Sequence, residues 1–280
     1  PAHASGPAPV PPPSAAAPTP QPGGQSGAAT SAPVYLLHGL EVRGGTDCAA
    51  TWRQATAELR SDGFRGPLIT WGFYSHDTHC TRRVNGTPGT SVLELGRRLA
   101  WDIYLRYSRH GVAVRAVTHS MGGLVVASAL AGVRAKPHTA KPWPPYLLVT
   151  DAVTLSTPFH GIAGRCSAKI RQCRDVKPGS ALLGWLAKHP AQGRGGTDWT
   201  LVGATTDTRV PFRSALAAPA KHKAVYLSGQ GITHYNLRHL DSGHSWRISY
   251  SNNGGATYRT TRHGVSPLHY AALALTGPAF

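Results

Sequence analysis

Apolar residues gather in short continuous runs along the chain, beginning at residue 34. Runs of this kind have the length of β-strands, and they alternate with stretches in which apolar residues recur every three or four positions. Strands that are apolar throughout are buried on both faces, which is typical of a parallel sheet covered by helices. The expected strands cover residues 34–37, 68–74, 112–118, 147–155, 199–203 and 224–227.

The stretches between these runs predict helices at residues 51–60, 124–130 and 267–275. A further helix has one apolar face, which is formed by Val92, Leu95, Leu99, Ile103 and Tyr107. Alternating strands and helices predict an α/β fold with a mostly parallel central sheet and helices on both faces. Residues 161–197 interrupt this order with Cys, Pro and Gly, and residues 246–250 and 256–261 flank an Asn-Asn-Gly-Gly turn that predicts a hairpin.

The first 32 residues differ in composition from the rest of the chain. They consist mainly of Pro, Ala, Gly, Ser and Thr, and no charged residue precedes Glu41. Such a segment cannot bury enough apolar area to offset the entropy lost on ordering, so residues 1–32 are predicted to be a disordered tail. Residues 33–280 are predicted to form one catalytic domain, in which residues 161–197 form a cap or lid.

The chain is strongly basic, with a formal net charge of +17. A nucleic-acid partner, adhesion to an anionic envelope and simple solubility are all consistent with such a charge. The longest basic runs are only pairs, Arg82-Arg83 and Arg97-Arg98, which predicts a dispersed basic surface without specific nucleic-acid binding. No stretch approaches the roughly 20 apolar residues of a membrane helix. We therefore expect a soluble monomer with at most peripheral contact with lipid or anionic surfaces.

Four cysteines and the first residues favour a secreted, extracellular protein. Ala2-His3-Ala4 has the A-x-A form of a signal-peptidase site. The cysteines allow three disulfide connectivities, of which Cys48–Cys80 and Cys166–Cys173 are favoured because each pair lies within one local segment. They lack the close pairs of a zinc site, and the sequence predicts neither a metal nor an organic cofactor.

The strongest chemical motif is Thr118-His119-Ser120-Met121-Gly122-Gly123. It lies between an expected strand and an expected helix, which is the context of a nucleophile elbow that lifts a serine above the sheet. The residues two before and two after the serine must be small, and Gly122 meets this requirement while Thr118 departs from it. The alternative is a serine in an ordinary strand–helix turn.

A nucleophilic serine needs a histidine base and an acid, which follow it in this chain order. Asp207 directly follows the carboxyl end of the expected strand 199–203. His234 follows the next strand, whereas His222 precedes that strand and His239 and His244 come later. Ser120, Asp207 and His234 are therefore the predicted catalytic residues. The acids excluded by position are Asp151, Asp175, Asp198 and Asp241.

The same chemistry requires backbone N–H donors for the developing oxyanion. The residue after the serine supplies one, which is Met121. The loop after the first core strand supplies the other, and in His38-Gly39-Leu40 the donor is Leu40, with Gly39 allowing close approach. His38 itself is interpreted as a packing or hydrogen-bonding residue.

Four motifs together resemble secreted actinobacterial lipases and esterases related to the bacterial class 2 lipases. They are the segments 35–39, 118–123, 155–161 and 207–211, and the resemblance runs from about residue 34 to the C-terminus. It implies an α/β-hydrolase fold, hydrolysis of carboxylic esters, and a position for residues 161–197 near the entrance of the site. Thr118 and Phe159-His160 depart from the family pattern, which concerns substrate preference more than catalysis.

The sequence thus predicts a secreted serine hydrolase that cleaves carboxylic esters or lipids through an acyl-enzyme. An acyltransferase or polyesterase with the same triad is an alternative, as is a catalytically silent basic protein that binds an envelope or another polyanion. The apolar side chains in residues 161–197 have two equal interpretations, a lipid-facing cap or inward packing; they are Leu182, Leu183, Trp185 and Leu186.

Overall fold

A computed structural model describes residues 30–139, 141–241 and 245–277. Residues 1–29, nearly all of the predicted tail, lie outside the described residues, as does His244. The first described residue, Thr30, already contacts the folded domain. Its carbonyl accepts hydrogen bonds from the N–H groups of Arg65 and Gly66 at 2.8 and 3.2 Å.

A nine-stranded sheet forms the centre of the described part of the chain, in the order β3-β2-β1-β4-β5-β6-β7-β8-β9. All neighbours from β3 to β7 are parallel, and β8 and β9 add an antiparallel hairpin at one edge. The strands are β1 (Val34–Leu37), β2 (Leu68–Gly72), β3 (Arg82–Arg83), β4 (Val114–His119), β5 (Val149–Leu155), β6 (Asp198–Ala204), β7 (His222–Tyr226), β8 (Trp246–Ser251) and β9 (Arg259–Gly264).

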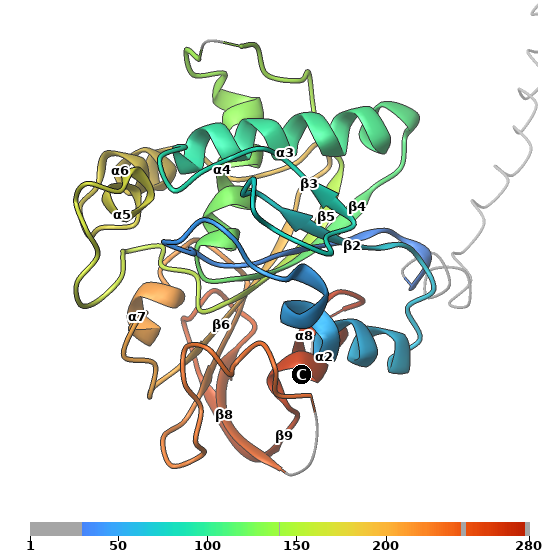
Figure 1. Ribbon diagram of the computed structural model, residues 1–280. Helices are drawn as coiled ribbons and strands as arrows, with labels where there is room; N and C mark the ends of the chain where they lie inside the picture. The colour runs from blue at the N-terminus through green and yellow to red at the C-terminus, as the bar shows by residue number, and fades with distance from the viewer. Residues whose placement is uncertain (1–29, 140, 242–244, 278–280) are drawn as a thin grey trace, which may run out of the picture.

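Helices cover both faces of this sheet (Figure 1). The α-helices are α2 (Cys48–Ser61), α3 (Val92–Arg106), α4 (Met121–Ala135), α5 (Arg171–Asp175), α6 (Ala181–Lys188), α7 (Phe212–Ala215) and α8 (Pro267–Ala274), and a 3₁₀ turn follows α3 at Ser108–His110. Successive strand side chains point to opposite faces, so β1 contributes to two cores. Tyr35 and Leu37 pack in the core with α3 and α4, while Val34 and Leu36 pack in the core with α2 and α8.

Helix α4 is buried on nearly all sides, from Met121 to Val133. Its contact with α3 is close, because a Cβ at Gly96 of α3 would lie 2.6 Å from the Ser128 Cβ of α4. A helix enclosed in this way is held rigidly against the sheet. It begins immediately after Ser120, and the fold therefore fixes the backbone at that residue.

The predicted α/β fold is confirmed in its mostly parallel sheet and its helices on both faces, and the predicted hairpin is β8 and β9. Helix α4 starts three residues earlier than expected, because the chain enters the helix directly from the turn at Ser120. Strand β3 and helix α7 were not predicted, since two and four residues are too short to show a hydrophobic period.

The apolar residues of α6 pack inward. Leu182 and Leu183 are buried members of the core that contains α3 and α4, and Leu186 packs against that core. Trp185 stacks on His189, with ring centroids 4.6 Å apart. Of the two interpretations of these residues, inward packing therefore holds for Leu182 and Leu183.

Both favoured disulfides are present. Cys48–Cys80 joins the start of α2 to the loop after β2, and Cys166–Cys173 joins the loop before α5 to that helix. In the described residues, no helix combines the length and the apolar character that a membrane crossing requires.

We expect the two disulfides to stabilise the fold unequally. Cys48–Cys80 spans 32 residues and Cys166–Cys173 spans 7. In the loop-entropy description their removal lowers the free energy of unfolding by up to about 3.7 and about 2.5 kcal/mol, respectively. Urea unfolding of the two double Cys→Ala variants measures both losses. A larger loss from the short loop would contradict the dependence on loop length.

Candidate active site

The site lies where the order of the sheet reverses. Strands β1 and β4 are neighbours, although α2, β2, β3 and α3 separate them in the chain, and Leu37 at the end of β1 pairs with Thr118 of β4. The chain leaves both strands at their carboxyl ends, so the loop that begins at His38 and the turn at Ser120 start side by side. In open α/β sheets this position is the usual place for a ligand.

Ser120 forms the sharp turn that the motif predicts. Its φ is 54° and its ψ is −130°, a backbone conformation that costs energy in a residue with a side chain. The turn is possible only because neighbouring backbone comes very close. A Cβ at Gly122 would lie 2.5 Å from the carbonyl oxygens of Leu37 and His38, and a Cβ at Gly39 would lie 2.9 Å from the Ser120 Cβ.

Two threonines accommodate this turn from neighbouring positions. Thr118, which departs from the usual small residue, is fully buried, and its hydroxyl donates a hydrogen bond to the Val153 carbonyl of β5 at 3.3 Å. Thr157 follows β5, and its hydroxyl donates to the Ser120 carbonyl at 2.8 Å. The larger residue at position 118 is thus compatible with the elbow.

The structure brings Ser120, His234 and Asp207 into one hydrogen-bonded chain. The Ser120 Oγ lies 3.0 Å from His234 Nε2, and His234 Nδ1 lies 2.8 Å from Asp207 Oδ2. A carboxylate only accepts hydrogen bonds, so Nδ1 carries the proton and Nε2 of the neutral ring is left to accept one from the serine hydroxyl. All three side chains are buried.

Asp207 is held as a carboxylate by its surroundings. Its other oxygen, Oδ1, accepts hydrogen bonds from the backbone N–H groups of Arg209 and Val210, both at 2.8 Å. Burial acts to raise the pKa of Asp207, but the hydrogen bonds from His234 and from the Val210 N–H together have a larger effect in the opposite direction, so the net pKa lies below the ordinary value. The acid is therefore ionised at neutral pH and fixed in orientation.

His119 contacts the backbone of His234. Its Nε2 lies 2.8 Å from the His234 carbonyl oxygen and its Nδ1 lies 3.1 Å from Nη1 of Arg238. A carbonyl accepts and a guanidinium donates, so Nε2 carries the proton and Nδ1 accepts. Burial, followed by the charges of His234 and Arg238, lowers the pKa of His119 well below its ordinary value and keeps this ring neutral.

Both predicted oxyanion donors, Leu40 and Met121, lie on the wall of a cavity that Ser120 also lines. Among the hydrogen bonds of the described residues, neither backbone N–H donates to a protein group. The Leu40 loop is supported from the next loop of the sheet, because the Glu41 N–H donates to the Tyr74 hydroxyl at 3.1 Å. That hydroxyl in turn donates to Gln172 Oε1 at 2.6 Å.

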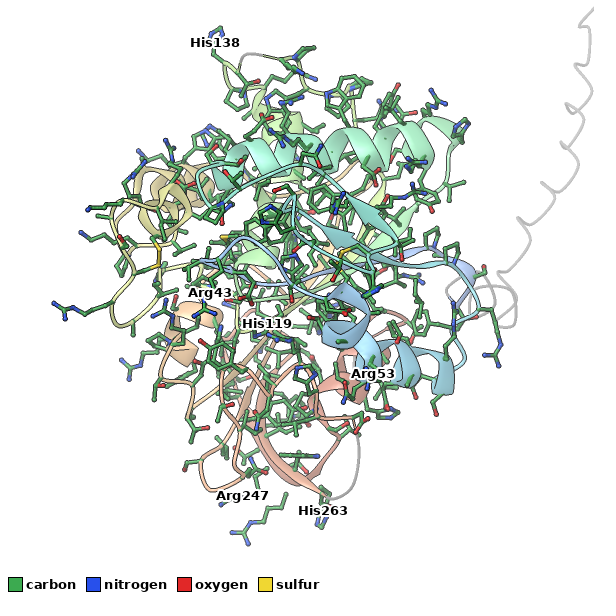
Figure 2. All side chains as sticks on the ribbon, viewed as in Figure 1. Arg43, Arg53, His119, His138, Arg247 and His263 are labelled. Atoms are coloured by element: carbon green, nitrogen blue, oxygen red, sulfur yellow. A yellow bond between two sulfur atoms is a disulfide. The ribbon has the colours of Figure 1, made fainter. Side chains whose placement is uncertain are left out.

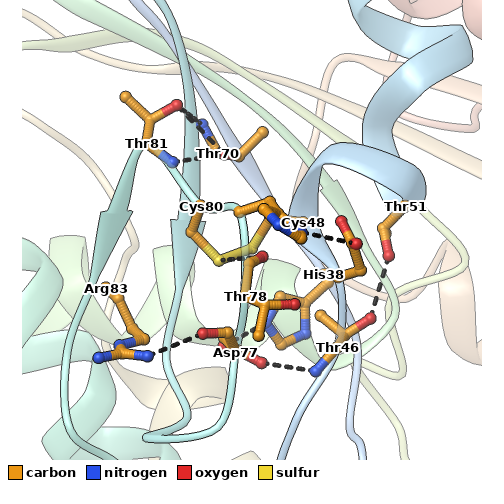
Figure 3. Close-up of a disulfide and its surroundings, with 12 residues drawn as sticks. His38, Thr46, Cys48, Thr51, Thr70, Asp77, Thr78, Cys80, Thr81 and Arg83 are labelled. Atoms are coloured by element: carbon orange, nitrogen blue, oxygen red, sulfur yellow. Dashed lines mark hydrogen bonds and ion pairs between the residues drawn. A yellow bond between two sulfur atoms is a disulfide. The ribbon is translucent and has the colours of Figure 1, made fainter.

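A buried histidine–aspartate pair supports the same loop (Figure 3). His38 Nε2 lies 3.0 Å from Asp77 Oδ2, and its Nδ1 donates to the Gly39 carbonyl at 2.8 Å. The ring of His38 therefore bridges the Asp77 carboxylate and the Gly39 carbonyl, which are both acceptors. Asp77 also accepts from the Thr46 and Tyr74 N–H groups, both at 2.8 Å, close to the Cys48–Cys80 disulfide. His38 is thus the hydrogen-bonding residue that the sequence predicts.

The cavity beside Ser120 has a volume of about 440 Å³. Residues 162–176 form one of its walls through Ile162, Arg165, Cys166, Ser167, Ile170 and Val176. The segment 161–197 therefore borders the site through its first half, and the apolar residues of α6 are not among the lining residues. Leu183 and Leu186 instead line a separate cavity of about 390 Å³.

The excluded acids and histidines have other partners. Asp151 pairs with Arg115 at 2.8 Å, and Asp175 accepts from the first N–H of α3 at 2.8 Å. His222 lies 3.3 Å from Asp198, and both are at the amino ends of their strands, away from the Ser120 turn; His239 lies 3.3 Å from Gln54. Among the candidate residues that the structure describes, Ser120, His234 and Asp207 are therefore the ones that form a Ser-His-Asp chain.

Sequence reasoning did not identify the supporting roles of His119, Thr157, Tyr74 and Asp77. His119 and Thr157 lie in the motifs 118–123 and 155–161, and their place in these motifs was the signal that could have identified them. Asp77 carries no local signal, because its partner His38 is 39 residues away.

Two groups of side chains in the described residues have metal-ligand spacing. One contains His38, Asp77 and Cys48, whose sulfur is already in a disulfide. The other contains Glu58, Asp62 and His269, in which the His269 Nδ1 hydrogen-bonds both carboxylates at 2.9 and 3.0 Å. Neither group includes a residue of the Ser120 hydrogen-bonded chain.

No protein-family model and no curated protein sequence matches the chain. Similar solved structures include a Legionella pneumophila phospholipase (16% identity, 62% of this chain and 38% of that chain, TM-score 0.43). A Bacillus licheniformis lipase in its propeptide form has 17% identity over 79% and 48% of the two chains, with a TM-score of 0.46. A Thermogutta terrifontis esterase has 14% identity over 74% and 84%, with a TM-score of 0.43. This chain thus spans less than half the length of the first two.

The pair formed by His38 and Asp77 makes stability depend on pH. Burial acts to raise the pKa of Asp77, but hydrogen bonding to His38 and to backbone N–H groups gives a net pKa below the ordinary value. A carboxylate with a lowered folded pKa stabilises the fold above its unfolded pKa, and this contribution is lost as the pH falls through the folded value.

We therefore expect Asp77→Asn to lower the free energy of unfolding at pH 7 by about 3 kcal/mol, since it removes the carboxylate that accepts three buried or part-buried hydrogen bonds. The difference from the wild type should shrink below about pH 4, near the unfolded pKa of Asp. Urea unfolding at pH 7 and pH 3 measures both values. Asp198→Asn, which removes a half-exposed partner of His222, should cost less than about 1 kcal/mol. A pH-independent loss at Asp77 would refute the assignment.

Proposed function

We propose that this protein is an exported serine hydrolase that cleaves carboxylic esters through an acyl-enzyme. The observation that carries the proposal is the hydrogen-bonded chain from the Ser120 Oγ through His234 to Asp207, at the wall of a cavity. A serine hydroxyl becomes nucleophilic when an oriented histidine can accept its proton. Two disulfides support export, because such bonds persist in oxidising compartments.

In the proposed first step, the Ser120 Oγ attacks the ester carbonyl while its proton passes to His234 Nε2. The ring is then cationic, and the carboxylate of Asp207 stabilises this charge through the hydrogen bond to Nδ1. The carbonyl oxygen becomes an oxyanion, for which the Leu40 and Met121 N–H groups are the proposed donors. Collapse of the tetrahedral intermediate transfers the proton from Nε2 to the leaving alcohol.

In the second step, water enters in place of the alcohol. His234 Nε2 accepts a proton from this water, whose oxygen attacks the acyl carbon bound to Ser120. Breakdown of the second intermediate returns the proton to the Ser120 Oγ and releases the carboxylic acid. Water therefore has to reach the side of Nε2 that the alcohol leaves.

Labelling by a fluorophosphonate tests the nucleophile. We expect stoichiometric modification of Ser120, identified by mass spectrometry of the modified peptide, and no modification of Ser120→Ala. Asp207→Asn should lower kcat on para-nitrophenyl esters by about 10⁴-fold, because the imidazole loses its orientation and the stabilisation of its charge. His222→Asn removes a different histidine–aspartate pair and should leave kcat within about twofold of the wild type. Folded wild-type protein without any label would refute the proposal.

The oxyanion loop gives a separate prediction. Gly39→Ala places a Cβ 2.9 Å from the Ser120 Cβ, so the loop or the serine must shift. Because catalysis is sensitive to displacements of this size, kcat/KM should fall at least about tenfold. Gly184→Ala is the matched control, since a Cβ there meets no heavy atom within 4 Å. Steady-state kinetics of both variants on one ester measures kcat/KM. Equal values for the two variants would contradict the close approach of Gly39 to Ser120.

A further inference from the structure

Three arginines line the cavity beside Ser120, namely Arg165, Arg209 and Arg238. Glu41 is the only carboxylate among the lining residues of this described cavity. The wall therefore carries three fixed positive charges against one carboxylate, next to the proposed nucleophile. This local excess is the feature of the cavity that the ester-hydrolase proposal leaves unexplained.

The three side chains come from different segments and converge on one space. Arg165 belongs to the segment before α5 and is exposed, while Arg209 follows Asp207 in the loop after β6 and is half-buried. Arg209 Nη1 donates to the Arg165 carbonyl at 3.1 Å, which ties these two segments together. Arg238 lies four residues after His234, and its Nη1 donates to His119 Nδ1 at 3.1 Å.

The two half-buried arginines of the cavity, Arg209 and Arg238, differ from the other buried or half-buried arginines of the described chain. Arg97 and Arg98 pair with Glu94, and Arg115 pairs with Asp151, all at 2.8 or 2.9 Å. None of the three cavity arginines has a carboxylate within 4.0 Å among the described residues. Guanidinium groups present a fork of N–H donors that suits carboxylate and phosphate oxygens.

We infer that the cavity takes anionic esters, whose acyl or alcohol part carries a carboxylate or a phosphate group. This inference rests on the proposed function, because it concerns the substrate of the same site. The anionic group binds the guanidinium groups of the cavity, while the ester carbonyl lies at Ser120. Binding energy from the charged end then holds the ester in place for attack.

The general basic surface does not explain such a preference. Figure 2 shows Arg247 at one end of the molecule, and the labelled Arg43 and Arg53 lie away from it. Charges spread in this way attract any anion weakly and are screened by salt. A cluster inside a cavity instead discriminates between substrates by which part of the molecule carries the charge.

Two pairs of substrates test the inference. The acyl pair is the mono-para-nitrophenyl ester of adipic acid and para-nitrophenyl heptanoate, which differ in the charge at the end of a chain of similar length. The alcohol pair is the acetate ester of para-hydroxyphenyl phosphate and phenyl acetate. We expect kcat/KM at least about tenfold higher for the anionic member of one pair, mainly through a lower KM. The preferred pair identifies the side of the ester that faces the arginines.

Arg165→Gln is the main variant, because its side chain is exposed and its removal leaves the backbone contact with Arg209 in place. It should lower kcat/KM for the preferred anionic ester about tenfold and change the value for the neutral ester less than twofold. Arg209→Gln should act in the same direction. Arg53→Gln removes the same charge from the exposed surface of α2 and should change neither substrate.

The outcomes separate the two proposals. No hydrolysis of any of the four esters, together with no fluorophosphonate label, overturns the proposed function itself. Hydrolysis of the neutral esters at rates equal to or above those of both anionic ones leaves the serine hydrolase in place and overturns the anionic preference. An anionic preference that Arg53→Gln reduces as much as Arg165→Gln does assigns the effect to the whole surface and also overturns the inference.

Discussion

The turn at Ser120 is the constraint on which the candidate site depends. The turn connects the end of β4 to the buried helix α4, and β1 ends beside it. Gly39 and Gly122, which lie next to the turn, have no space for a side chain. The carbonyl oxygens of Leu37 and His38 would lie 2.5 Å from a Cβ at Gly122, so the elbow and the oxyanion loop are packed against each other. A shift of one displaces the other. The positions of Ser120 and Leu40 are therefore coupled through the close contact between the end of β1 and the start of α4.

Buried carboxylates support the elements around this contact. The chain has 12 Asp and Glu residues against 29 Lys and Arg, and several of these acids are buried in supporting positions. Asp77 holds His38, Asp207 holds His234, and Asp175 accepts a hydrogen bond from the first N–H of α3. Because these acids are engaged elsewhere, guanidinium groups beside Ser120 have no carboxylate within ion-pair distance. The positive charges of the cavity are thus left without a paired carboxylate, whereas charges on the exposed surface are screened by solvent and salt.

The fold and the hydrogen-bonded chain of the site could be predicted because both follow from local patterns. Apolar runs mark the strands, and the carboxyl ends of parallel strands meet at one edge, which is why Asp207 and His234 could be chosen by position alone. The role of Asp77 could not be found in this way, since its contact with His38 joins loops after two different strands. The two-residue β3 was missed for a related reason: it exists through its pairing with β2 and has no pattern of its own.

His119 connects the charge of the cavity to the geometry of the proposed base. Its ring accepts from Arg238 through Nδ1 and donates to the His234 carbonyl through Nε2, and a neutral imidazole can do both only in this one tautomer. The guanidinium thus disfavours a proton on Nδ1 and fixes the donor on Nε2. The backbone of His234 is held at 2.8 Å from that donor, while its side chain is held at 2.8 Å from Asp207. An arginine of the cavity wall is therefore one hydrogen-bonded residue away from the backbone that positions the base.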